Sequence, residues 1–188
     1  MPPVPEEQIR RAQLAESFRQ EFDATLDARI DRHIAAAHHP IVANSLFAPA
    51  SAECLESFRD GRFYGCISLC QAAGEALVRY MCTSNGWTPA KDFDENVRQL
   101  QKRGKVDEKF VLSCNVLWKA RNTYHHLNSS VETDRIRLEA LALEKIRSLA
   151  TMEAWAFEYT TPDGNFAPAR PQYWRVEGQM AQVYLRLE

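Results

Sequence analysis

The sequence predicts an all-α protein, an up-and-down helical bundle with an extra N-terminal helix and a small C-terminal extension. Apolar residues recur at helical spacing over several long segments. Residues that favour helix N-termini stand before three of these segments. The 188 residues include only 7 glycines and 9 prolines, and several of these fall at the joins between the segments. A chain of this length and composition is expected to form one main hydrophobic core.

The first 50 residues are expected to form an amphipathic helix followed by a connector. No glycine or proline occurs between Pro5 and Pro40, and apolar residues recur there every four or five positions. We expect the helix to end at His38 and His39, because a residue that precedes proline is disfavoured in helical conformation. Residues 41–50 are expected to form an ordered connector that lies against the core. The apolar positions of the helix are Ile9, Leu14, Phe18, Phe22, Leu26 and Ile30.

Residues 51–160 are expected to form the bundle, and its first half contains three predicted helices. Ser51 is a suitable N-cap for a short helix that closes at Asp60-Gly61. The most apolar segment of the chain follows, from Phe63 to about Thr83, and is expected to be the central helix. Asp92, with Glu95 three residues later, resembles a capping box for a helix that ends at Gly104.

Two longer helices are expected in the second half of the bundle. One is expected from Asp107 to about Asn128, and the other begins after Thr133 or Asp134 and continues to about Tyr159. Ile136 belongs to the apolar residues of the last helix that are expected to face inward. In the extension, residues 161–188, alternating apolar residues on either side of Gly178 predict a β-hairpin within residues 172–188.

Composition and motifs exclude several classes of function. The net charge of -2 means that any binding to nucleic acid has to depend on a local basic patch. Five cysteines without a CxxC pair indicate buried thiols in a reducing compartment. Neither a signal peptide nor a membrane-spanning stretch is recognisable, so the expected location is the cytoplasm, without membrane contact. The motifs of nucleotide-triphosphate and zinc sites are absent from the sequence, so we expect no metal and no cofactor.

The segment from Trp118 to His126 contains the main candidates for chemistry. It places Arg121, Asn122, His125 and His126 on a helix that is otherwise apolar. Helical spacing sets Asn122 and His126 on one face, and Arg121 and His125 on the adjacent face. Arg121 and His126 point in different directions, and a second copy of the helix, related by a two-fold axis, could bring one of each together.

The same residues also fit a purely structural role. Arg121 could pair with Glu75 or Glu139 inside the bundle, and His126 could be an ordinary helix-end histidine. Trp118 and Tyr124 could belong to the core.

The run Arg121-Asn122-Thr123-Tyr124-His125-His126 resembles the motif of the HEPN superfamily (higher eukaryotes and prokaryotes nucleotide-binding). That motif is an arginine, commonly followed by a polar residue, with a histidine four to six residues further along. Residues 60–64 and 72–80, which begin and continue the central helix, are similar to the family's first core helix. The resemblance covers roughly residues 51 to 160 and leaves the first helix and the extension unexplained.

The resemblance implies a metal-independent endoribonuclease that acts as a homodimer, in defence or toxin–antitoxin biology. Cleaving RNA without a metal needs a base for the 2′-hydroxyl, an acid for the leaving 5′-oxygen and a cation for the phosphate oxygens. On this view His126 transfers a proton and Arg121 binds the phosphate. Asn122 orients His126 or the backbone, and His125 is a spare donor or the second proton-transfer group.

The expected partners are RNA, or a nucleotide, and an antitoxin or another partner protein. From Arg98 to His126 there are seven Lys or Arg residues and only two acidic ones, which is a basic patch that could guide RNA. The residues expected to contact RNA are Lys102, Arg103, Lys105, Lys119 and Tyr124. The alternative is a non-catalytic module of the same superfamily that binds a nucleotide or a partner protein.

Overall fold

A computed structural model describes residues 5–36, 39–43, 45–177 and 180–186. In chain order its helices are α1 (Glu6–Ala35), α2 (Phe47–Arg59), α3 (Phe63–Ser84), α4 (Phe93–Lys102), α5 (Glu108–Trp118), α6 (Arg121–His125) and α7 (Arg135–Ala156). The strands are β1 (Ile41–Ala43), β2 (Tyr159–Thr160), β3 (Ala167–Pro168), β4 (Arg175–Glu177) and β5 (Met180–Leu185), with short 3-10 helices at Pro162–Gly164 and Pro171–Tyr173. The fold is therefore mostly helical, as predicted.

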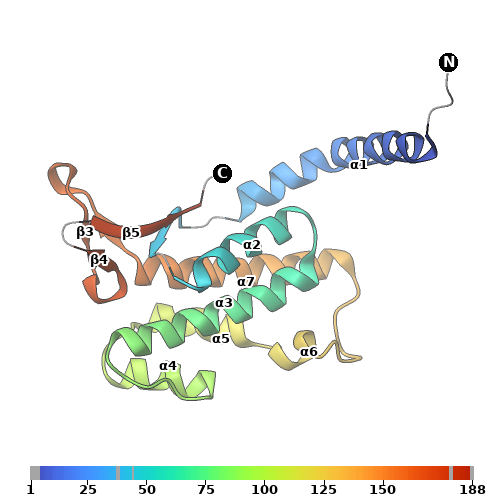
Figure 1. The fold of residues 1–188 in the computed structure, drawn as a ribbon. Coiled ribbons are helices and arrows are strands. Elements are labelled where there is room, and N and C mark those ends of the chain that lie inside the picture. The colour runs from blue at the N-terminus through green and yellow to red at the C-terminus, as the bar shows by residue number, and fades with distance from the viewer. Residues whose placement is uncertain (1–4, 37–38, 44, 178–179, 187–188) are drawn as a thin grey trace.

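Helix α3 is the central element of the bundle (Figure 1). It packs against α2, α4, α5, α6 and α7, while α5 also packs along α7. All five cysteines are free and buried, as the sequence predicts. Among the described residues, no helix is both long and apolar enough to cross a membrane.

Helices α3 and α5 approach each other closely at Gly74. A Cβ atom at this position would overlap Cδ2 of Leu117, which is itself fully buried. Glycine at this point of α3 therefore lets the C-terminal end of α5 pack directly on the central helix.

The predicted hairpin forms, and it joins a strand from the N-terminal connector. Strands β4 and β5 are antiparallel, and β5 also pairs with β1 so that Ile41 lies opposite Leu185. The predicted turn at Gly178 lies outside the described residues. The connector thus forms a strand, because a two-stranded hairpin is marginal alone and gains stability from a third strand.

A buried polar cluster ties the end of β5 to the helices. Arg186 donates hydrogen bonds to Glu153 of α7 and to Ser51 of α2, and Ser51 donates to the same carboxylate. Another guanidinium nitrogen of Arg186 donates to the backbone oxygen of His39. The prediction that Ser51 caps α2 is therefore wrong. The helix begins at Phe47, so Ser51 lies in its second turn, where its hydroxyl donates to Glu153 and does not cap the helix.

Several other boundaries match or depart from the prediction. Asp92 and Asp134 cap α4 and α7, each accepting a hydrogen bond from the backbone three residues later. Two predictions for the second half of the bundle are wrong. Ile136 does not face inward, since it is 80% exposed beside the N-terminus of α7. The segment predicted as one helix over residues 107–128 is broken into α5 and α6.

Helix α1 extends away from the bundle for most of its length (Figure 1). None of its residues is buried, and only its C-terminal end is anchored. There Arg29 pairs with Asp60 at 2.7 Å, and Arg32 pairs with Glu139 at 2.8 Å. The helix ends at Ala35, a few residues before the predicted end at His38 and His39; His39 is not helical, and His38 lies outside the described residues.

Candidate functional site

The chain leaves helical conformation between α5 and α6, and buried hydrogen-bond donors from two neighbouring helices stabilise this break. The break occurs at Ala120, whose φ of 61° places it in the left-handed region. Lys145 of α7, fully buried, donates to the carbonyl oxygens of Val116 and Lys119. Gln71 of α3 donates to the carbonyl of Leu117 at 3.1 Å. These donors satisfy the end of α5, so the chain can leave the helix without burying unpaired carbonyls.

A second left-handed residue closes α6. Leu127 has φ of 47°, and the backbone N–H of Asn128 donates to the carbonyl of Thr123 at 3.0 Å, as in a Schellman motif. The side chain of Asn128 also donates to the carbonyl of Asn122. A short helix is thus bounded on both sides by non-glycine residues with positive φ, a conformation that costs about 1–3 kcal/mol per residue and is concentrated at functional sites.

The guanidinium of Arg121 is restrained by contacts within the chain. It lies 4.0 Å from the carboxylate of Glu75 and 4.8 Å from the centre of the Trp118 ring, and it donates to the side chain of Asn122 at 3.4 Å. Its Nε is buried and has no hydrogen-bond partner among the described residues. The pairing with Glu75 is one of the two structural alternatives that the sequence suggests, whereas Glu139 pairs with Arg32 instead.

The two histidines lie at the C-terminal end of α6 and are exposed. The ring of His125 is still partly covered, and this partial burial lowers its pKa; the positive charges of Arg121 and His126 lower the pKa further, and Glu75 opposes them. The backbone N–H of His126 donates to the carbonyl of Asn122, one turn earlier. Asn122 thus binds His126 through its backbone carbonyl, while its side chain accepts a hydrogen bond from Arg121.

Tyr124 fastens α6 to the bundle. It is only 5% exposed, and its ring lies 6.2 Å from that of Tyr64 on α3. Its hydroxyl accepts a hydrogen bond from the backbone of Glu132, and Tyr64 donates to the carbonyl of the same residue at 2.7 Å. This packing leaves little of the Tyr124 ring available for stacking with a base.

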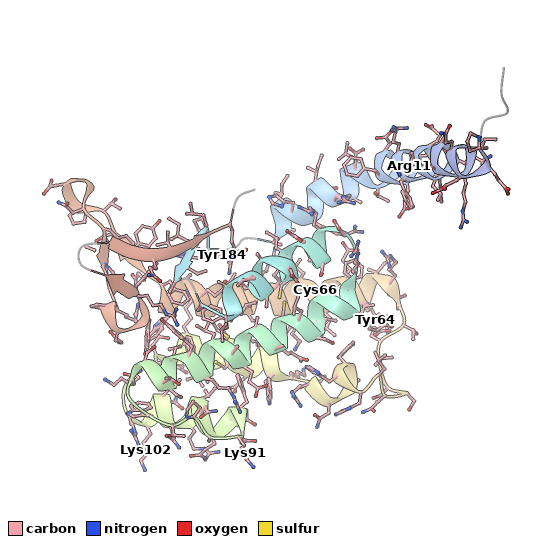
Figure 2. The ribbon with its side chains drawn as sticks, viewed as in Figure 1. Arg11, Tyr64, Cys66, Lys91, Lys102 and Tyr184 are labelled. Atoms are coloured by element: carbon pink, nitrogen blue, oxygen red, sulfur yellow. The ribbon has the colours of Figure 1, made fainter. Side chains whose placement is uncertain are left out.

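The predicted basic patch is divided between two parts of the molecule. Lys119 is exposed and adjoins α6 in the chain. Lys102 is at the end of α4, and the view of Figures 1 and 2 separates it widely from α6. Arg103 follows Lys102 and lies over the ring of Trp87 at 4.1 Å, and Lys105 is exposed in the loop after α4. Only Lys119 is thus placed beside the arginine and the histidines.

A groove of about 670 Å³ lies between the N-terminal end of α5 and the C-terminal half of α7. Most of its charged lining has partners inside the protein. Arg147 donates to the carbonyl of Ala35, Arg170 donates to Glu158, and Asp107 accepts from the indole N–H of Trp155. These side chains make contacts that stabilise the fold. The exposed histidines of α6 are therefore better candidates for catalysis than the charged lining of this groove.

Among the described residues, no group of three or more His, Cys, Asp or Glu side chains is placed to hold a metal ion. A scan against protein-family models finds no match to this chain, and neither a curated protein nor a solved structure matches it significantly. The geometry around α6 is therefore the basis for a functional proposal.

The residues that shape this site are only partly visible in the sequence. Glu75 is recognisable as a partner for Arg121 because it is an acidic residue in the most apolar helix. Lys145 and Gln71 are missed, although each stands in a row of buried apolar residues at helical spacing. Lys145 lies between Ala142 and Leu149 on α7, and Gln71 follows Ile67 on α3. A polar residue within such a row is the signal that could have identified them.

Proposed function

We propose that this chain is a metal-independent endoribonuclease of HEPN type that works in the cytoplasm as a homodimer. The observation that carries the proposal is α6 itself, a short helix bounded by strained residues that presents two exposed histidines one turn from Arg121. Defence or toxin–antitoxin biology, with an antitoxin as partner, belongs to the same proposal.

The proposed mechanism divides the chemistry between the two histidines and the arginine. His126 of one protomer and Arg121 of the other face a single phosphodiester. Arg121 binds the phosphate oxygens, for which it must exchange the weak contact with Glu75. His125, whose pKa is lowered, accepts the proton of the 2′-hydroxyl as the 2′-oxygen attacks the phosphorus. His126 donates a proton to the 5′-oxygen as its bond to phosphorus breaks, which leaves a 2′,3′-cyclic phosphate and a 5′-hydroxyl. Lys119 contacts the RNA backbone.

The first experiment measures cleavage of labelled RNA by the purified protein in the presence of EDTA. Wild type is expected to cleave, whereas His126→Ala and Arg121→Ala are expected to be inactive while retaining their helical content. Asn115→Ala, an exposed position on α5, is the control and is expected to keep full activity. Cleavage by His126→Ala at the wild-type rate would contradict the proposal.

A mixing experiment tests whether the site is composite. If Arg121 and His126 of different protomers form each site, an equilibrated equal mixture of the two inactive variants is expected to regain about a quarter of wild-type activity. Half of the dimers then contain one chain of each kind, and each of these has one intact site. A mixture that stays inactive, although mixed dimers form, would refute the composite site.

One observation favours a second candidate function. The contacts of Arg121 with Glu75 and Trp118 hold the guanidinium against its own bundle. A non-catalytic module that binds a nucleotide or a partner protein would use α6 in this restrained form. It predicts that no RNA is cleaved and that binding persists in His126→Ala.

A further inference from the structure

Helix α1 carries a row of exposed apolar side chains that does not reach the core of the described chain, although the guanidinium of Arg29, on the same helix, lies 4.9 Å from the centre of the Phe22 ring. Leu14, Phe18 and Phe22 are spaced by four residues, and Phe18 is 64% exposed. Residues at this spacing form one ridge on a helix. Exposed apolar rows of this kind mark interaction surfaces, since a helix gains most of its stability from packing an apolar face.

A positive charge lies at the N-terminal end of this ridge and a negative charge near its C-terminal end. Arg11 precedes the ridge, Glu21 lies near its end, and both are exposed. At about 100° per residue, Arg11, Leu14, Phe18 and Glu21 fall within an arc of about 80°, so they share one face of α1. Within the part of the chain that the structure describes, neither Arg11 nor Glu21 takes part in an ion pair.

From this arrangement we infer that α1 pairs antiparallel with α1 of a second copy of this chain. A two-fold axis midway between Leu14 and Phe18 sets Leu14 opposite the partner's Phe18, and Arg11 opposite the partner's Glu21, because both pairs are equidistant from the axis. A parallel pair would instead bring Arg11 against Arg11 and Glu21 against Glu21. Charge complementarity therefore favours the antiparallel arrangement over the parallel one. It also favours a second copy of this chain as the partner that covers the ridge.

The ridge also fixes how the helices cross. Since the apolar residues follow a single row of four-residue steps, two such rows interdigitate at a crossing angle of about -50°. The contact is then short and centred on Leu14 and Phe18, and it differs from an extended coiled coil. Figure 1 shows the free part of α1 extending toward the same side of the view as α6. The inference does not rest on RNA cleavage.

The test is the mass of the full chain in solution, without RNA, measured by light scattering or sedimentation over a range of concentrations. Wild type is expected to be a dimer. Phe18→Asp is expected to weaken dimerisation by about 100-fold or more, because it removes one buried phenylalanine from each protomer. Ile34→Asp is the matched control, since Ile34 is 74% exposed but lies about 160° around the helix from Phe18. It is expected to dimerise as wild type does.

Charge exchange tests the direction of pairing. Arg11→Glu and Glu21→Arg are each expected to weaken dimerisation about 5- to 10-fold, because each change creates two like-charge contacts per dimer. The double variant is expected to restore it. The helical content measured by circular dichroism should be unchanged in all variants, since none of these residues is buried within the single chain. A monomeric wild type, or a Phe18→Asp variant that dimerises normally, would overturn the inference, whereas a dimer without ribonuclease activity would overturn only the proposed function.

Discussion

The carboxylate of Glu153 lies 2.7 Å from the guanidinium of Arg186, and both side chains are buried. Glu153 belongs to α7, whereas Arg186 follows β5, so one ion pair joins the helical bundle to the extension. A buried pair of this kind contributes little relative to apolar residues of equal size, but removing one partner leaves the other charge uncompensated.

Arg186→Met is therefore expected to lower the free energy of unfolding by about 3–5 kcal/mol. The measurement is urea denaturation followed by circular dichroism. Arg19→Met is the control, because its ion pair with Glu16 is exposed and its loss should cost less than about 1 kcal/mol. Adding Glu153→Met to Arg186→Met is expected to recover part of the loss, and a double variant no more stable than the single one would contradict this account.

Gly74→Ala is expected to destabilise the protein by about 1–3 kcal/mol, since the added methyl group overlaps the fully buried Leu117. Gly65→Ala provides a comparison on the same helix. No atom lies within 4 Å of a Cβ at that position, so the better helix propensity of alanine should raise stability by up to about 1 kcal/mol. Thermal melts of the two variants should shift in opposite directions, and equal shifts would show that the contact between α3 and α5 is looser than described.

Removing the charge of Arg121 is expected to raise the pKa of His125. Burial would still hold this pKa below its ordinary value of 6.5, but one of the two cations that disfavour the protonated ring would be absent. Glu75→Gln should have the opposite effect and lower the pKa further, because Glu75 favours the protonated form. NMR titration of the imidazole Cε1–H in Arg121→Gln and Glu75→Gln tests both signs, with Lys102→Gln as a distant control. Shifts of the same sign in the two variants would be inconsistent with this electrostatic arrangement.

Lys145→Met is expected to release α6 from its position. The substitution retains most of the side-chain volume but removes the donor to the carbonyls of Val116 and Lys119, each of which costs about 1–3 kcal/mol when buried without a partner. Amide hydrogen exchange of residues 121–126 should become faster than in wild type. Lys109→Met, at an exposed position on α5, should leave this exchange unchanged, and protection retained in Lys145→Met would mean that Gln71 alone holds the break.

The sequence correctly predicts those helix starts that depend only on residues close together in the chain. The central helix begins at Phe63 as expected, and the side chains of Asp92 and Asp134 mark two other starts correctly, because a cap needs only residues that follow within one turn. The hairpin follows from alternation alone. The sequence also identifies Arg121, His125 and His126 as neighbours, since they lie within one and a half turns of each other.

Two of the predictions that fail depend on residues far away in the chain. The break at Ala120 depends on Lys145 and Gln71, which lie 25 and 49 positions away, and nothing in the segment itself indicates a break. Ser51 is recruited by Arg186 and not by its own helix end. In each case a tertiary hydrogen bond overrides the local preference that the sequence displays.

The pairing of β1 with β5 joins residues separated by about 140 positions. On the ribosome, Ile41 and its neighbours emerge early and have no strand to pair with until residues 180–185 have been synthesised. The carboxylate of Glu153 has no guanidinium partner until Arg186 has been synthesised. Until then, α2 and α7 can pack against each other only with the uncompensated negative charge of Glu153 between them. The helical part of the nascent chain is thus expected to remain loosely packed, and open to proteases, until the last strand leaves the exit tunnel.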